Sequence, residues 1–292
     1  MIMWRANHNS VHFVPKEAQT VTAILEQHFS VDPEKQRALF SLGAIYLNKK
    51  RLLKDAKINA KDHLQIYLNP RRYPANEINW SSVVVGEETN FIIINKPRGI
   101  PVHSTDDNLT ENVLYQLRKI LDQELWVTHR LDNPVSGLMV LAKTSKYQAE
   151  FNRLLSERKV SKFYRALVER EPKLGVLKHF MSPEEKTPRK LSEEPKENWQ
   201  ECILEILKVE PWKDLEGKKF WEVEIELHTG RTHQIRAQIS KVGSPILGDK
   251  MYRGRNRAGF TRSLLALHSS RLVWVDSTGK HQFEIDPSFK LK

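Results

Sequence analysis

Hydrophobic and polar positions in the first part of the chain follow helical spacing and then strand spacing. Val21, Ile24 and Leu25 lie three and four positions apart, and Thr20 stands before them as a capping residue, so the spacing predicts a short amphipathic helix. The pattern then predicts a second helix ending at Gly43 and two strands joined by a basic turn, with the elements at 33–42, 45–47 and 64–68. A segment rich in proline and arginine follows at 69–74, and we interpret it as a linker.

The rest of the chain combines segments with helical spacing of apolar residues and segments with strand spacing. Residues 221–227 alternate apolar side chains with glutamates, which is typical of a strand with one solvated face. Further strands are predicted at 91–94 and 138–141, and helices with one apolar face at 113–121, capped by Thr110, and at 147–155. Residues 178–197 combine charges with prolines and are expected to form a surface excursion. Without a regular βαβ rhythm, the pattern predicts an α+β fold with a mixed sheet. We expect a small module over 1–72 and a larger domain over 73–292.

Composition narrows the class of protein. The 292 residues include 47 Lys and Arg against 36 Asp and Glu, a formal charge of +11, which is compatible with a polyanionic partner. The single cysteine, Cys202, excludes an intramolecular disulfide and is expected to be a buried strand thiol. No apolar run reaches the ~20 residues of a membrane helix, and the start lacks a secretory signal, so we expect a cytoplasmic protein that does not associate with membranes.

Three separated segments carry candidate chemistry. Around Asp132, an arginine, an Asn-Pro pair and a Ser-Gly pair indicate a carboxylate on a tight turn, although such an Asp often only caps its own backbone. Arg231 opens a helix on which Gln234 and Gln238 follow at helical spacing, a polar stripe suited to an anion or simply to solvent. The strand at 159–167 interleaves basic and aromatic residues, as RNA-binding surfaces do and as half-buried strands also do.

Together these segments carry a specific signature. In order, the motifs are I-N-K-P-R-G-I-P-V-H, H-R-L-D-x-x-x-S-G-L-x-x-x-A-K, K-x-Y-x-A-L-V, L-x-T-G-R-T-H-Q-I-R and G-x-P-I-x-G-D-x-x-Y, at 94–103, 129–143, 162–168, 227–236 and 243–252. This series resembles the RluA-type family of RNA pseudouridine synthases, and the first module is similar to the alpha-L, ribosomal S-four-like RNA-binding module. The resemblance implies the pseudouridine synthase fold, with a mixed, largely antiparallel central sheet flanked by helices.

The resemblance also implies an activity and a set of site residues. It implies that specific uridines of ribosomal or transfer RNA are flipped out and isomerised to pseudouridine without a cofactor or a metal. Asp132 matches the family's catalytic carboxylate, Tyr164 its active-site tyrosine, and Arg231 is expected to pair with Asp132 and keep it charged. Arg130 is expected to occupy the space that the flipped base leaves. The remaining substrate-binding candidates are Lys162, Gln234 and Arg236.

Other interpretations of the same residues stay open. A protein of this fold that has lost its chemistry would bind RNA or assist ribosome assembly, although Asp132, Tyr164 and Arg231 are all present. A hydrolase using His129, Asp132 and Ser136 is disfavoured because three neighbours on one turn rarely reach triad geometry. A zinc site on His228 and His233 is disfavoured because the two lie across a strand–helix junction. Nothing in the pattern demands more than a monomer.

Overall fold

The computed structural model describes residues 5–7, 10–184, 187–213, 217–254 and 264–287. The chain forms two compact units, one made of Met1–Trp80 with Ile100–Gln123 and the other of Ser81–Gly99 with Glu124–Lys292. Residues 100–123 thus belong with the first part of the chain. The functional boundary near residue 72 stays a prediction.

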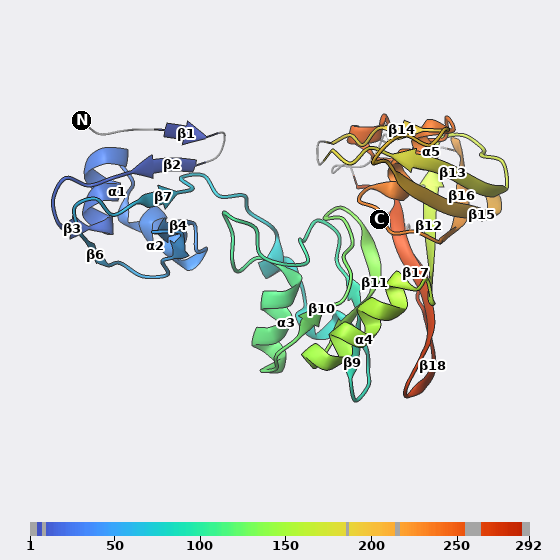
Figure 1. The fold of residues 1–292 in the computed structure, drawn as a ribbon, viewed down its shortest axis with the longest axis horizontal. Coiled ribbons are helices and arrows are strands. Elements are labelled where there is room, and N and C mark those ends of the chain that lie inside the picture. The colour runs from blue at the N-terminus through green and yellow to red at the C-terminus, as the bar shows by residue number, and fades with distance from the viewer. Residues whose placement is uncertain (1–4, 8–9, 185–186, 214–216, 255–263, 288–292) are drawn as a thin grey trace. The chain divides into compact units, whose positions relative to one another are not determined.

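The first unit combines three helices with short strands (Figure 1). Its five-stranded sheet has the order β1-β2-β7-β4-β5, formed by Arg5–Asn7, Ser10–Phe13, Leu64–Ile66, Ile45–Leu47 and Lys50–Arg51. A separate pair joins β3 (Gln19–Thr20) to β6 (Lys57–Ile58). The helices are α1 (Val21–Phe29), α2 (Pro33–Ser41) and α3 (Val113–Leu121). Short 3-10 turns follow at Ala75–Glu77 and Trp80–Ser82.

Helix capping explains where these helices begin. The Thr20 hydroxyl accepts the Ala23 amide, which confirms the predicted cap of α1. The cap predicted for α3 is wrong by two residues. The side chain of Asn112, not that of Thr110, accepts the Tyr115 amide, because Val113 is the first helical residue and a cap stands directly before it.

An 11-stranded sheet forms the centre of the second unit. Its main path is β14-β13-β15-β16-β12-β17-β11-β9-β8, with β10 added to β11 and β18 to β17. In that order the strands are Leu191–Ser192, Gly175–Met181, Gln200–Lys213, Lys219–Leu227, Val160–Val168, Leu267–Asp276, Ser136–Ala142, Phe91–Lys96 and Val84–Glu87, with β10 at Trp126–Val127 and β18 at Gly279–Glu284. Among the strands that the structure describes, only β11 and β17 pair in parallel, so the sheet is mixed and largely antiparallel as predicted.

Two helices pack on this sheet through apolar faces. Helix α4 (Ser145–Ser156) buries Tyr147, Phe151 and Leu154, and its cluster includes residues of β9, β11 and β17. Helix α5 (Gln234–Lys241) buries Ile235 and Ile239 in a second cluster, formed with β12, β15 and β16. A 3-10 turn at Lys250–Tyr252 follows. Each cluster covers a different stretch of the sheet, and Asp132 lies on a turn next to the second.

The alternating strand is confirmed, and the surface excursion is only partly so. Along β16, Val223 and Ile225 are fully buried, while the alternating Glu222, Glu224 and Glu226 are half exposed. Within 178–197, however, β13 continues to Met181 and pairs with β14, because this stretch completes the outer edge of the sheet. No helix among the described residues is long and apolar enough to cross a membrane.

Gly137 allows β11 to approach β17 closely. Its φ is +115°, and a Cβ there would lie 2.3 Å from the Ser269 carbonyl oxygen. Gly175 has a similar φ of +113° with nothing within 4 Å of a Cβ. We therefore expect Gly137→Ala to lower the free energy of unfolding by at least about 3 kcal/mol more than Gly175→Ala does. Urea denaturation of both variants measures the difference, and equal losses would contradict the steric argument.

Candidate active site

Asp132 lies on the turn that joins β10 to β11. The Val135 amide donates to the Asp132 carbonyl (3.0 Å), and the Gly99 amide donates to the Asn133 carbonyl (2.8 Å). The neighbours Leu131 and Val135 are buried, whereas the Asp132 side chain keeps 23% of its surface exposed. The turn therefore holds a carboxylate at the edge of the apolar core, where another molecule can reach it.

A fully buried lysine supports this turn. Lys96, the last residue of β9, donates through Nζ to the carbonyls of Pro97 (2.9 Å), Asn133 (3.1 Å) and Val135 (2.9 Å). Burial lowers the pKa of Lys96 to about 7, while the negative charge of Asp132 acts in the opposite direction. Lys96 thus ties β9 to the backbone on both sides of Pro134. Sequence reasoning used it only as part of a motif and missed this role.

The start of α5 decides which arginine faces Asp132. His233 has φ 60°, in the left-handed region, and α5 begins only at Gln234. The Gln234 side chain accepts the Arg231 amide (3.0 Å) and so helps to close the preceding turn. Arg231 therefore precedes the helix and is exposed, whereas Arg236 lies in the first helical turn with 7% of its side chain exposed.

Arg236 joins two carboxylates. Its Nε and one terminal nitrogen donate to the two oxygens of Asp249 (2.7 and 2.9 Å), and the other terminal nitrogen, NH1, donates to Oδ2 of Asp132 (3.1 Å). The Asp249 side chain is only 1% exposed and also accepts the amides of Met251 and Tyr252. A bidentate contact of this kind fixes the guanidinium plane, so Asp249 holds Arg236 where its positive charge meets Asp132.

His233 and Tyr252 complete the surroundings of Asp132. Nε2 of His233 lies 3.6 Å from Oδ2 of Asp132, and Nδ1 lies 3.2 Å from the Tyr252 hydroxyl. Burial lowers the pKa of His233, with Asp132 acting in the opposite direction. The Tyr252 hydroxyl accepts the Arg189 amide (2.8 Å), which holds the phenol beside Nδ1 of His233. His233 thus lies between the Tyr252 hydroxyl and the Asp132 carboxylate.

Tyr164 lies on β12 with 6% of its surface exposed, and its cross-strand neighbours are Ile225 and Ser269. Burial raises the pKa of Tyr164 far above its usual value, the charge of Asp132 raises it further, and the Ser269 hydroxyl acts in the opposite direction. The phenol therefore keeps its proton at neutral pH.

The expected partner of Asp132 is corrected by this geometry. The guanidinium that binds the carboxylate belongs to Arg236 and not to Arg231, because the left-handed His233 delays the start of the helix. The prediction that Gln234 and Gln238 form a polar stripe facing an anion or solvent is also wrong. Gln234 and Gln238 are buried and bonded to each other (2.9 Å). Gln234 also bonds Thr229 (2.8 Å) and the Ile203 carbonyl (3.1 Å), so it supports the fold and does not face a ligand.

The two other substrate-binding candidates differ in exposure. Arg130, two residues before Asp132, is exposed. Lys162 is half-buried on β12, and burial lowers its pKa. Its Nζ lies 3.4 Å from the position of a Cβ built on Gly230, which places it beside the turn that precedes α5. Their roles toward RNA stay predictions.

The hydrolase alternative does not fit the observed partners. His129 accepts the Val140 amide through Nε2 (3.2 Å), and Ser136 Oγ instead contacts Nδ1 of His268 (2.9 Å). The suggested zinc pair is not assembled either, since His228 faces Glu205 while His233 faces Asp132. Each imidazole has a separate structural partner.

The Ser136–His268 contact predicts acid sensitivity. Burial lowers the pKa of His268 to about 4, below the usual 6.5, so the unfolded chain binds the additional proton between these pH values. The contribution of neutral His268 to stability is complete above pH 6.5 and is lost as the pH falls through 4. Between pH 6.5 and 4, we expect the free energy of unfolding of the wild type to fall by up to about 1.4 kcal/mol per pH unit more than that of His268→Asn. Urea denaturation at several pH values measures this free energy for both proteins. If the two depended on pH in the same way, the prediction for His268 would be contradicted.

Comparison with known sequences identifies the family. A family model described as RNA pseudouridylate synthase matches residues 90–241. The chain therefore belongs to this family, as the motif series predicted. Ribosomal large subunit pseudouridine synthase C of Buchnera aphidicola subsp. Schizaphis graminum is 32% identical over 271 residues, which cover 84% of this chain and 82% of that protein.

Further comparisons show how much of its relatives' length this chain covers and which known fold it shares. RNA pseudouridine synthase 6, chloroplastic, of Arabidopsis thaliana is 34% identical over 255 residues, 76% of this chain and 54% of that protein. The chain thus spans about half the length of the plant relatives it matches. The structure of human RNA pseudouridylate synthase domain containing 4 superimposes with a TM-score of 0.59 at 24% identity, covering 72% of this chain and 90% of that chain. This likeness confirms the predicted fold.

Proposed function

We propose that the protein isomerises uridine to pseudouridine in RNA, with Asp132 as the catalytic carboxylate. The observation that carries this proposal is the group Asp249–Arg236–Asp132. The buried ion pair with Asp249 orients Arg236 so that its remaining nitrogen, NH1, donates to the partly exposed Asp132 carboxylate. Such preorganised charge is what a reaction that develops charge beside a glycosidic bond requires. Family membership supports the same activity.

The proposed roles follow from what each side chain touches. Asp132 acts on the nucleoside in its ionised form, with Arg236 compensating its charge. Tyr164 offers a ring face for the uracil and a protonated hydroxyl for hydrogen bonding. Arg130 enters the space left by the flipped base, since its exposed guanidinium can stack and donate hydrogen bonds together. Arg231 and Lys162 contact the RNA backbone beside the site. No cofactor is invoked, because the base leaves and rejoins the same ribose.

We propose ribosomal RNA as the substrate class ahead of transfer RNA. The Buchnera relatives are ribosomal large subunit pseudouridine synthases C and D, which supports this choice. We also propose that residues 1–72 form the alpha-L module that binds RNA. Lys49 and Lys50 are exposed on the β4–β5 turn, where they can contact phosphates, and Arg51 packs over the Tyr46 ring (4.9 Å).

Mapping of pseudouridines tests the substrate. Ribosomal and transfer RNA from cells with and without the gene is treated with carbodiimide, and reverse-transcription stops mark each pseudouridine. We expect one or a few stops in ribosomal RNA to disappear without the gene and to return with the wild-type protein, but not with Asp132→Asn. Loss of stops in transfer RNA alone would overturn the ribosomal assignment. Unchanged stops in both would argue for an RNA-binding protein without chemistry.

Two variants separate the proposed functions of Tyr164. We expect Tyr164→Phe to lower kcat by about 10²-fold with little change in KM, because the ring remains while the hydroxyl is lost. Tyr164→Ala is expected to raise KM as well, since the uracil loses its stacking surface. Single-turnover and steady-state kinetics on the mapped RNA measure both. Tyr147→Phe is the control, because that hydroxyl bonds Asp276 (2.6 Å). Full activity of Tyr164→Phe would leave stacking as the only function.

A further inference from the structure

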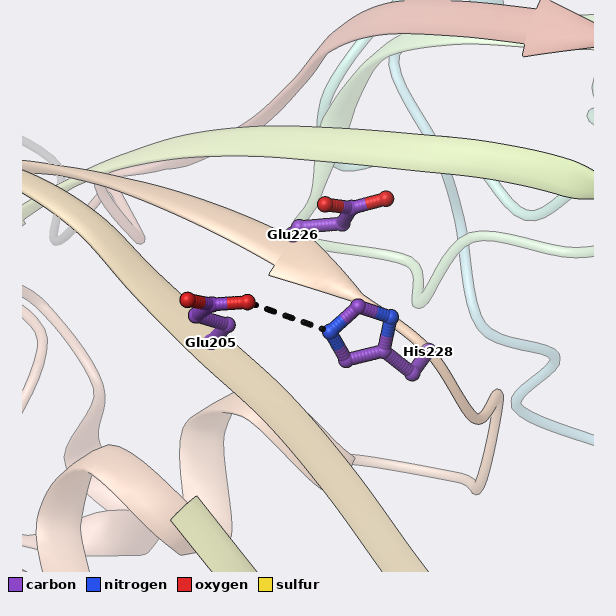
Figure 2. A group of neighbouring side chains, drawn as sticks. All are labelled: Glu205, Glu226 and His228. Atoms are coloured by element: carbon purple, nitrogen blue, oxygen red, sulfur yellow. Dashed lines mark ion pairs between the residues drawn. The ribbon is translucent and has the colours of Figure 1, made fainter. Parts of the chain in front are cut away.

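A group of three side chains outside the proposed active site has the composition of a metal site. Glu205 on β15 and Glu226 on β16 are direct cross-strand partners, and His228 follows just after β16 ends (Figure 2). Nε2 of His228 lies 3.6 Å from Oε2 of Glu205. One potential ligand atom from each residue lies within 4.8 Å of the others. All three are half-buried, so an ion from solvent can reach them.

The glutamates of β16 show why this group is unusual. Glu222 pairs with Arg165, and Glu224 pairs with Arg271 (3.0 Å). Among the described residues, neither Glu226 nor its neighbour Glu205 forms an ion pair with a lysine or arginine. Two like charges directly opposite each other across strands are destabilising. The row of glutamates is thus neutralised at two positions and lacks a cation at the third, where an imidazole nitrogen lies nearby.

The separation of the donor atoms fits a small divalent ion. Zinc binds imidazole nitrogen and carboxylate oxygen at about 2.0–2.2 Å, which places ligand atoms of a tetrahedral site about 3.4 Å apart. The His228–Glu205 distance of 3.6 Å is close to this value before any ion has drawn the ligands inward. The ligand atom of Glu226 lies within 4.8 Å of the other two, so this side chain would have to turn inward to complete the site. One nitrogen and two oxygens also match the donor types that zinc accepts.

We propose that Glu205, Glu226 and His228 form a zinc site with a fourth position open to water. The ion would neutralise the opposed glutamates and fasten the end of β16 to β15. The chain runs from His228 directly into the turn that carries Arg231 and His233, so the ion would also hold the start of that turn. The site is independent of the proposed activity and goes beyond the sequence-based expectation that the protein binds no metal.

Titration of the untagged full-length protein with Co²⁺ tests the proposal, since tetrahedral Co²⁺ has visible absorption bands and reports on a zinc site. We expect saturation at one ion per chain and displacement by Zn²⁺. Glu226→Gln and His228→Gln should each weaken binding by at least about tenfold. The matched control is Glu224→Gln, a change on the same strand and face at a glutamate that has an arginine partner. A second control is His12→Gln, because His12 and His63 lie 3.0 Å apart and also attract metals.

The outcomes are distinct. Loss of binding in Glu226→Gln and His228→Gln, with unchanged binding in both controls, supports the site. A rise in thermal midpoint with Zn²⁺ in the wild type but not in Glu226→Gln supports it further, and circular dichroism without metal shows whether the variants are folded. Absence of saturable binding below millimolar Co²⁺, or equal binding by all variants, overturns the proposal. If only His12→Gln lost Co²⁺ binding, the metal would bind at His12 and His63, and the proposed site would also be overturned.

Discussion

Asp132→Asn is expected to abolish pseudouridine formation while leaving RNA binding nearly intact. The amide has the size and shape of the carboxylate but no charge, so the turn held by Lys96 should keep its backbone while the reactive group is lost. We expect turnover to fall by about 10⁴-fold or more, as with removal of a central catalytic group. Tritium release from 5-tritiated uridine in the mapped RNA measures turnover, and filter binding measures affinity.

Asp122→Asn is the matched control for that experiment. Asp122 is an exposed residue at the C-terminal end of α3 with φ 47°, a conformation that asparagine tolerates. The same chemical change at this position should leave turnover unchanged. If Asp132→Asn retained even a tenth of the wild-type rate, Asp132 would not be the catalytic carboxylate and the proposed function would fail.

Arg236→Gln is expected to abolish activity and to destabilise the fold, whereas Arg231→Gln should do neither to a comparable degree. Removing the Arg236 guanidinium leaves Asp249 charged and buried without its ion pair, a change that costs about 3–5 kcal/mol. It also removes the positive charge beside Asp132. Arg231 is exposed, so its loss should weaken RNA binding modestly and leave the free energy of unfolding almost unchanged.

A double variant separates the stability effect from the catalytic one. Arg236→Gln combined with Asp249→Asn no longer buries an unpaired charge, so we expect much of the lost stability to return. Activity should stay absent, because Asp132 still lacks its counter-charge. Urea denaturation and tritium release on the same preparations give both values. Should Arg231→Gln be inactive and Arg236→Gln active, the partner of Asp132 would be the residue first predicted from the motif.

The sequence predicted the elements whose information is local. The glutamate alternation of β16, the Thr20 cap of α1 and the apolar face of α4 depend on neighbours within a few positions, and each was confirmed. The Asn-Pro and Ser-Gly pairs also predicted the turn that carries Asp132. The arginine was assigned wrongly because the pattern does not reveal that His233 is left-handed. That single backbone angle determines which positions of the motif are helical and therefore which side chain faces Asp132.

Features that depend on distant partners were not predictable in this way. Nothing near Lys96 in the chain indicates that its ammonium group will meet the Asn133 and Val135 carbonyls, because these are nearly forty positions away. The supporting role of Asp249 has the same origin, since it becomes visible only when the 3-10 turn packs against α5. Glu205 and Glu226 face each other only through the register of β15 with β16.

The parallel pairing of β11 with β17 has a consequence for protein synthesis. Ser136 meets His268 although 132 positions separate them, and Tyr164 has Ser269 as its cross-strand neighbour. A nascent chain therefore carries Asp132, Tyr164 and Arg236 out of the ribosome well before the strand that completes their sheet. Because contacts between distant segments form slowly, we expect the proposed site to assemble only after β17 has left the ribosome, so that a chain released before this strand would lack it.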